Sequence, residues 1–148
     1  MKRSVEAKTA TPARPRWSVD GSLRTPAILI VDDFPPMLKI LRAQLAEIGL
    51  TDVDTAGGAR QALAALQHRD YDLLILDHYL GDSTGQEILA SLAASPRDGE
   101  TPSIIITGEP ERAARDIGAM LDWLRKPFTA SQLLSRIEST CPHWRMTA

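Results

Sequence analysis

Residues 71–77 have the sequence Tyr71-Asp-Leu-Leu-Ile-Leu-Asp77, in which four consecutive apolar residues end abruptly at an acid. A short apolar run bounded by turn-forming residues, here Leu80-Gly-Asp-Ser-Thr-Gly85, is typical of a strand buried on both faces, as in a parallel sheet. Asp77 would then lie at the carboxyl end of the strand, where open α/β sheets bind their ligands. The alternative is that Asp77 only caps the strand or begins the turn.

Strand-like and helix-like segments alternate on both sides of this run. Further strands are predicted at residues 27–31, 53–56, 103–107 and 122–126. Helices are predicted from Pro35 to Gly49, over 58–69, from 84 or 85 to 94, over 110–120, and from Thr129, where Thr129-Ala-Ser-Gln132 has the spacing of a capping box. Five such units with short connections predict an α/β fold, a doubly wound parallel sheet with helices on both faces.

Length and composition limit the class of protein. The 148 residues are enough for one domain that buries its own core without a metal or disulfide. No apolar run approaches the roughly 18 residues of a membrane span, so no membrane partner is expected. The single cysteine, Cys141, cannot form an internal disulfide, and residues 1–24 lack the apolar core of a secretory signal. These features predict a cytoplasmic protein.

Charge is divided unevenly along the chain. Residues 1–24 hold six basic and two acidic residues without a helix or strand period, and they are predicted to be a flexible basic tail whose Trp17 can dock on the body. Residues 25–141 are predicted to form the domain, and 142–148 a short C-terminal tail. Beyond residue 24 there are 17 acidic and 11 basic residues, so direct nucleic-acid binding is not expected.

Polar residues close four of the predicted strands. Asp32 and Asp33 follow the first strand, and Asp77, Thr107 and Lys126 end three later ones. Parallel strands end at the same edge of a sheet, so these side chains are expected to meet there. Two like charges about 4 Å apart repel by roughly 4 kcal/mol at an effective dielectric near 20, and three acids together therefore call for a cation. Oxygen ligands without a His or Cys cluster favour Mg²⁺ or Mn²⁺.

The combination of acids, hydroxyl and ammonium predicts phosphoryl chemistry. A carboxylate can act as nucleophile on a phosphoryl group when its own charge is offset. Lys126 would neutralise one phosphoryl oxygen and Thr107 would donate a hydrogen bond to another. No residue resembles a general base for hydrolysing an ester. The site is therefore predicted to accept a phosphoryl group on Asp77 and to retain it.

Four motifs, in this order, resemble the receiver domain of two-component response regulators, the CheY-like superfamily. They are Ile-Val-Asp32-Asp33, Leu-Leu-Ile-Leu-Asp77 with Gly85 eight residues later, Ile-Ile-Ile-Thr107-Gly108, and Lys126-Pro127-Phe128. The resemblance covers residues 27 to 141. It implies a flavodoxin-like fold with strand order 2-1-3-4-5 and phosphorylation by a histidine kinase or a histidine phosphotransfer protein.

The resemblance also implies a role for each site residue. Asp77 would be the phosphoacceptor, and Asp33 and Asp77 would bind Mg²⁺ together with the backbone carbonyl of Tyr79. Asp32 would assist through water, and Lys126 would pair with the phosphoryl group.

The resemblance implies a switch as well. Thr107 would sense the phosphoryl group, and Trp123 would change rotamer as Thr107 moves; the alternative for Trp123 is plain packing on an edge strand. The peptide bond before Pro127 is often cis in this family.

Only residues 142–148 follow the last helix, so a stand-alone receiver that signals to a downstream protein through contacts is expected. Such a protein would catalyse its own phosphorylation and dephosphorylation without being a dedicated enzyme.

Two other functions remain open. A pseudo-receiver would bind partners without turning over phosphate, and a phosphatase of the haloacid dehalogenase type would need a second acid where Tyr79 stands.

His78 should point to the opposite face from Asp77 by strand alternation and is expected to be a packed or surface residue. Tyr79 and Glu109 would flank the path of an attacking water, and we hypothesise that Tyr79 slows loss of the phosphoryl group.

Overall fold

Five parallel strands form the central sheet of the computed structural model, which describes residues 16–19, 21–80, 83–84, 87, 101–109, 111–112, 115 and 122–147. The strand order is β4-β3-β5-β8-β9. Their bounds are β3 Ile28–Val31, β4 Val53–Ala56, β5 Leu73–Asp77, β8 Ser103–Thr107 and β9 Asp122–Arg125. Counted along the chain, this is the predicted order 2-1-3-4-5, and the doubly wound sheet is confirmed.

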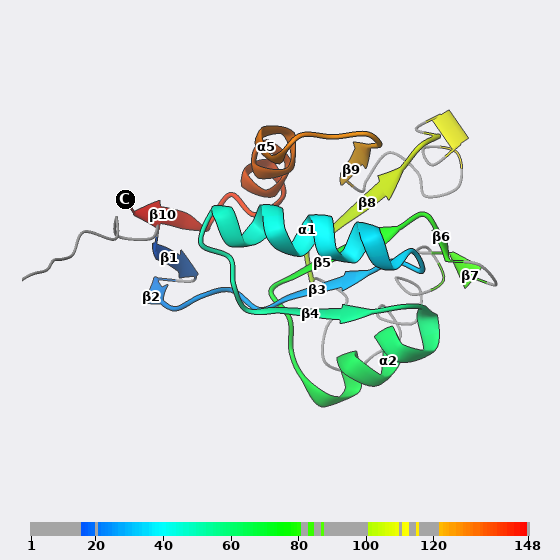
Figure 1. The fold of residues 1–148 in the computed structure, drawn as a ribbon. Coiled ribbons are helices and arrows are strands. Elements are labelled where there is room, and N and C mark those ends of the chain that lie inside the picture. The colour runs from blue at the N-terminus through cyan, green and yellow to red at the C-terminus, as the bar shows by residue number, and fades with distance from the viewer. Residues whose placement is uncertain are drawn as a thin grey trace, which may run out of the picture.

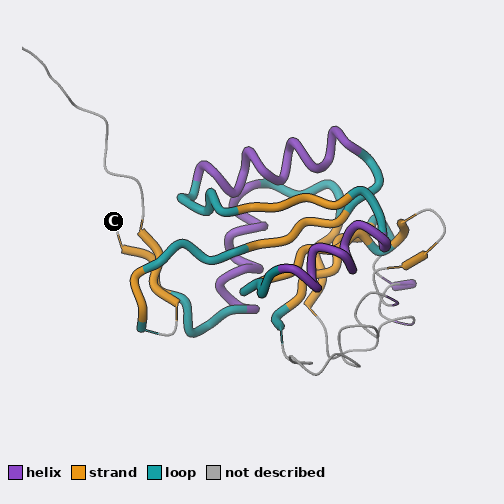
Figure 2. The backbone as a smooth tube through the Cα atoms, turned by 90° about the horizontal axis from the view of Figure 1, so that it is seen from below, coloured by secondary structure: helices purple, strands orange, loops and turns teal. Residues whose placement is uncertain are grey.

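Helices cover both faces of this sheet (Figures 1 and 2). Helices α1 (Pro35–Glu47) and α5 (Ala130–Thr140) lie on one face, and α2 (Ala59–His68) lies on the other. Alternate residues of one strand serve the two cores: Ile28 and Ile30 pack in the cluster with α1 and α5, whereas Leu29 and Val31 pack in the cluster with α2. Burial on both faces explains why the strands are continuous apolar runs.

The ends of two helices follow from local sequence. Helix α1 begins at Pro35, where a missing N–H is tolerated, and the chain turns at Gly49 with a φ of 82°, which glycine adopts without steric strain. At the start of α5, the Thr129 hydroxyl accepts from the Gln132 N–H at 3.1 Å, and the Gln132 side chain accepts from the Thr129 N–H at 2.9 Å. The predicted capping box is therefore confirmed.

Two predicted helices fall mostly outside the described residues. Of the helix expected to end at residue 94, only Glu87 is described, and it is helical. Of the helix expected over 110–120, residues 111, 112 and 115 are described as helical. Strands β6 (Tyr79–Leu80) and β7 (Ser83–Thr84) pair antiparallel, which agrees with a turn after β5. Each helix in the described part of the chain is too short or too polar to cross a bilayer.

A second, antiparallel sheet joins the two ends of the described chain. Its strands are β1 (Arg16–Val19), β2 (Ser22–Leu23) and β10 (Arg145–Thr147), in the order β10-β1-β2. Strands β1 and β2 lie in the segment expected to be a flexible tail, residues 1–24, and β10 lies in the expected short C-terminal tail, residues 142–148. The strands are only two to four residues long, so each is stable because it pairs with the others and not because of its own sequence.

Two tryptophans attach this terminal sheet to the domain. Trp17 is 4% exposed and donates a hydrogen bond from Nε1 to the Ile48 carbonyl at 2.8 Å, at the end of α1. Its ring meets that of Trp144 edge to face, with centroids 5.8 Å apart, a favoured aromatic geometry. The expectation that Trp17 docks on the body is confirmed.

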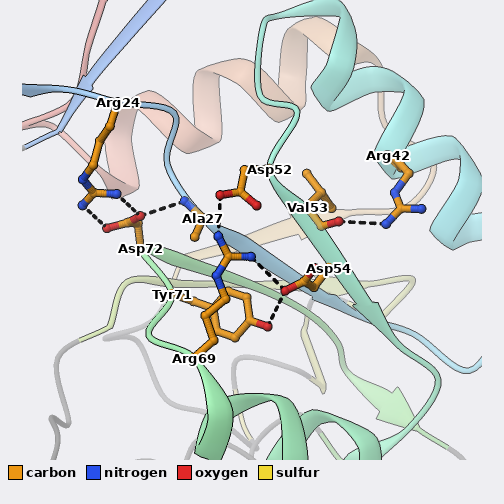
Figure 3. Close-up of polar contacts among 9 residues, drawn as sticks. All are labelled: Arg24, Ala27, Arg42, Asp52, Val53, Asp54, Arg69, Tyr71 and Asp72. Atoms are coloured by element: carbon orange, nitrogen blue, oxygen red, sulfur yellow. Dashed lines mark hydrogen bonds and ion pairs between the residues drawn. The ribbon is translucent and has the colours of Figure 1, made fainter.

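Ion pairs lie at the amino ends of the sheet strands (Figure 3). The Arg24 guanidinium donates two hydrogen bonds of 2.7 Å to the Asp72 carboxylate, which also accepts from the Ala27 N–H at 2.7 Å. Burial opposes ionisation of Asp72, but these hydrogen bonds outweigh it and hold its pKa below the ordinary value. The connection from β2 to β3 is thereby fastened to the residue that precedes β5.

A separate cluster fastens the end of α2 to β4. Arg69 pairs with both Asp52 and Asp54, and the Tyr71 hydroxyl donates to Asp54 at 2.7 Å. The hydrogen bond from Tyr71 lowers the pKa of Asp54, and Arg69 lowers it further. Both clusters lie at the amino ends of the strands. They stabilise the sheet at the edge opposite to its carboxyl edge, where the predicted site lies.

Candidate functional site

Three carboxylates converge at the carboxyl edge of β3 and β5. These strands are parallel neighbours with Val31 beside Leu76, so the residues that follow, Asp32 and Asp77, are brought side by side. One oxygen from each of Asp32, Asp33 and Asp77 lies within 4.8 Å of the others. Asp32 and Asp77 are buried and Asp33 is exposed, so the cluster opens to solvent on one side. The predicted meeting of these acids is confirmed.

Lys126 faces this cluster from the end of β9. Its ammonium nitrogen lies 3.2 Å from Asp77 Oδ1 and 3.9 Å from Asp32 Oδ2. The Lys126 N–H donates to the Thr107 carbonyl at 2.8 Å, which extends the β8–β9 ladder by one residue, and the Lys126–Pro127 peptide bond is cis. The side chain is 29% exposed, so the pair is partly shielded from water. The lysine predicted to oppose the acids therefore does so.

The electrostatics of Asp32 match a cation site. Burial raises the pKa of its carboxyl group, and the charge of Asp77 adds to the rise; the N–H of Phe34, which donates to Oδ1 at 2.9 Å, acts in the opposite direction. Its other oxygen, Oδ2, is buried and accepts no hydrogen bond from the described residues. A buried acceptor without a hydrogen bond is unfavourable, and the Lys126 ammonium 3.9 Å away offsets this only in part, so a hydrated cation bound here would stabilise the carboxylate further. An all-oxygen donor set of this kind is consistent with Mg²⁺.

Thr107 ends β8 one residue beyond Ile106, the register partner of Asp77, and is 1% exposed. Within the described chain its hydroxyl has two partners: it accepts from the Glu109 N–H at 2.9 Å and lies 3.3 Å from His78 Nδ1. The structure therefore places Thr107 at the predicted edge, with its hydroxyl engaged by neighbours other than Asp77.

The contact of His78 with Thr107 was not predicted. His78 is 1% exposed and packs against the Tyr79 ring at a centroid distance of 4.3 Å, so the expectation of a packed histidine is confirmed. The register of β5 and β8 pairs Asp77 with Ile106, which sets the next residues of the two strands beside each other. That register was the signal that could have revealed the contact.

Two further residues named from the sequence lie on strands next to those that form the site. Trp123, on β9, is half-buried and packs against the core cluster on the α2 face of the sheet. Tyr79 is 39% exposed, and the Arg112 guanidinium lies 5.1 Å from the centre of its ring. Gly85 lies outside the described residues.

Known proteins resemble the chain over this same region. The response regulator receiver domain family matches residues 28–138. The chemotaxis protein CheY of Pseudomonas aeruginosa is 33% identical over 115 residues, which are 75% of this chain and 92% of that protein. The transcriptional regulatory protein TcrA of Mycobacterium tuberculosis is 36% identical over 115 residues, but these are only 44% of its length. The crystal structure of CheY4 from Vibrio cholerae has a TM-score of 0.70 at 27% identity and covers 79% of this chain and 99% of CheY4.

Proposed function

The chain belongs to the response regulator receiver family, and from this membership we propose that Asp77 accepts a phosphoryl group from the phosphohistidine of a histidine kinase or a histidine phosphotransfer protein. The observation that carries the proposal is the convergence of three carboxylate oxygens within 4.8 Å, with Lys126 Nζ 3.2 Å from Asp77. A buried acid with an adjacent cation is what a nucleophilic carboxylate requires, because its charge must be offset before an anionic phosphoryl group can approach.

The transfer exchanges one bond to phosphorus for another. A carboxylate oxygen of Asp77 forms a bond to phosphorus, the P–N bond of the donor phosphohistidine breaks, and its electron pair remains on the imidazole nitrogen. Lys126 already lies beside the attacking carboxylate and would pair with a phosphoryl oxygen as charge moves onto the new group. The reaction therefore needs positioning and charge neutralisation more than proton transfer.

The acidic cluster would hold the divalent ion of this reaction. Asp33, Asp77 and the backbone carbonyl of Tyr79 would bind Mg²⁺ or Mn²⁺, and Asp32 would act through water. The buried Oδ2 of Asp32, which has no hydrogen-bond partner in the described chain, supports this assignment. The bound ion would neutralise phosphoryl oxygens during transfer.

The response would pass through Thr107 and Trp123. A phosphoryl group adds up to about two negative charges next to Thr107, and its oxygens are strong acceptors for a hydroxyl. We expect the Thr107 hydroxyl to turn towards it and Trp123, on the neighbouring strand, to follow. Phosphorylation would thereby favour one of two arrangements that already exist in equilibrium.

The signal is proposed to leave through protein–protein contacts. Seventeen acidic residues against eleven basic ones beyond residue 24 are unfavourable for binding nucleic acid directly. A pseudo-receiver is the second candidate, but the ion pair of Lys126 with Asp77 favours a working acceptor. A phosphatase of the haloacid dehalogenase type is disfavoured because Tyr79 occupies the position of its second acid.

Phosphorylation by a small donor tests the proposal. The protein is incubated with Mg²⁺ and acetyl phosphate, and the intact mass is measured before and after hydroxylamine, which cleaves acyl phosphates. We expect a labile adduct in the wild type and none in Asp77→Asn, while the matched variant Asp70→Asn, an exposed acid outside the cluster, still forms it. An adduct that persists in Asp77→Asn contradicts the assignment. Continuous release of phosphate from simple esters would indicate the phosphatase instead.

A further inference from the structure

The hydroxyl of Thr107 belongs to a closed ring of contacts, one of which is made by a backbone N–H. His78 Nδ1 lies 3.3 Å from Thr107 Oγ1, and the Glu109 N–H donates to the same oxygen at 2.9 Å. The Glu109 carboxylate lies 3.7 Å from Arg112, whose guanidinium lies 5.1 Å from the Tyr79 ring centre. The Tyr79 ring packs on His78 at 4.3 Å and closes the ring.

The contacts in this ring differ in strength because they differ in burial. Glu109 and Arg112 are more than half exposed, so their ion pair is screened by water and contributes little. His78 and Thr107 are each 1% exposed, so the contact between them is shielded from water. Breaking it would remove a polar contact between two buried groups at a place where water cannot readily replace it, which is unfavourable. The inner contact therefore restrains the hydroxyl more than the outer ones do.

We propose that His78 is a positioning residue that holds the Thr107 hydroxyl in the unphosphorylated arrangement and so sets how readily the domain responds. The inference rests on the proposed function, in which Thr107 turns towards the phosphoryl group on Asp77. A hydroxyl that turns away from His78 loses this contact. The lost interaction makes the active arrangement less favourable relative to the unphosphorylated one. The apparent affinity for any phosphoryl group is then lowered by the small fraction of molecules in which Thr107 has been released.

Beryllofluoride mimics a phosphoryl group on a carboxylate. Its binding affinity reports this fraction without any phosphoryl transfer. Its affinity in the presence of Mg²⁺ is measured by calorimetry for the wild type, His78→Leu and His78→Asn. Leucine fills the buried site but cannot hydrogen bond, so we expect beryllofluoride to bind about threefold to tenfold more tightly, the effect of losing one hydrogen bond. Asparagine places a polar atom near the position of Nδ1 and should retain the wild-type affinity.

A second background separates positioning from general packing. In Thr107→Val the hydroxyl is absent, so adding His78→Leu should leave the affinity for beryllofluoride unchanged. Equal tightening in both backgrounds, or no tightening in His78→Leu alone, overturns the role of His78. If the wild type itself fails to bind beryllofluoride with Mg²⁺, the proposed function fails, which is a different outcome.

A spectroscopic measurement on the wild type covers the case in which His78→Leu does not fold. The ¹⁵N resonance of His78 Nδ1 reports its hydrogen bond. Thr107→Val should shift it, and beryllofluoride should shift the wild-type resonance in the same direction while leaving that of Thr107→Val in place. A wild-type resonance that Thr107→Val does not move shows that no restraint exists.

Discussion

The ammonium nitrogen of Lys126 lies 3.2 Å from Oδ1 of Asp77, although 49 positions separate the two residues in the sequence. The same nitrogen lies 3.9 Å from the buried Oδ2 of Asp32. The Lys126 ammonium is thus shared by two carboxylates. Lys126 directly follows β9, the edge strand of the sheet, so this cation is a fixed part of the fold. Any second cation that binds the acids must do so beside this ammonium.

Replacing the ammonium should therefore strengthen metal binding while weakening phosphorylation. Two unit charges about 4 Å apart repel by about 1 kcal/mol even in a water-like dielectric, and Mg²⁺ carries two, so Lys126→Met should bind Mg²⁺ at least about fivefold more tightly. The same variant should form the adduct with acetyl phosphate more slowly, because nothing pairs with the phosphoryl oxygen. Calorimetry and intact mass provide the two readouts. An unchanged Mg²⁺ affinity would show that the ammonium does not act on the metal site.

Tyr79 is expected to govern how long the phosphoryl group lasts. Its ring packs on His78 and under Arg112, two residues beyond Asp77, so it is held beside the expected path of water. Tyr79→Asn should shorten the half-life of the adduct by about threefold to tenfold, a barrier change of about 0.7–1.4 kcal/mol. Tyr79→Phe keeps the ring and is the matched control, with an expected half-life near that of the wild type. The hypothesis fails if both variants decay at the wild-type rate.

The ion pair of Arg24 and Asp72 predicts a loss of stability in acid. The pKa of Asp72 lies below its ordinary value, so this carboxylate stabilises the fold above about pH 4 and the contribution is lost as pH falls through the folded pKa. Arg24→Ala should lower the free energy of unfolding by about 1 kcal/mol at pH 7, a value reduced for the exposure of Arg24, and the difference should shrink as the pH falls through the folded pKa of Asp72. Urea titrations at several pH values measure this.

The control for this prediction is Arg60→Ala, an exposed arginine on α2 outside the cluster. It should be close to the wild type at every pH. If Arg24→Ala lowers stability by the same amount at every pH down to the most acidic at which the protein folds, the effect does not come from ionised Asp72.

Cys141 should report opening of the terminal sheet. The thiol is 1% exposed and burial raises its pKa to about 12, so alkylation at pH 8 should be slow in the native protein. Trp17→Ala removes the ring that packs on Trp144 and should be destabilising by about 3–5 kcal/mol. We expect Cys141 to react faster in this variant while the adduct with acetyl phosphate still forms. Equal reaction rates would show that the terminal sheet does not shield the thiol.

Burial explains which parts of the fold the sequence predicted. Strands covered on both faces must be apolar throughout, so Leu73–Leu76 and Ile104–Ile106 identified β5 and β8 without ambiguity. Once the strands were parallel, the meeting of Asp77 with Asp32 and Lys126 followed from topology alone. The capping box at Thr129 followed from local spacing.

The features that were missed depend on pairing across long separations. Strand β1 has one large aromatic residue, and its partnership with β10 joins Arg16 to Thr147, which no local pattern encodes. The contact of His78 with Thr107 required the register of two strands as well as their direction. Oδ2 of Asp32 accepts no hydrogen bond within the described part of the chain, and this depends on the rotamer of Asp32, which sequence does not specify.

The pairing of β1 with β10 places the two ends of the described chain next to each other. Arg16 and Thr147 are direct partners in the register, and Figure 1 shows this sheet at the opposite end of the molecule from β6 and β7. A short peptide could join these two residues, and new ends could then be opened in an exposed connection elsewhere. A permuted protein of this kind would keep the acidic cluster intact, and it would let a fused reporter be moved around the domain to find the position that responds most to phosphorylation.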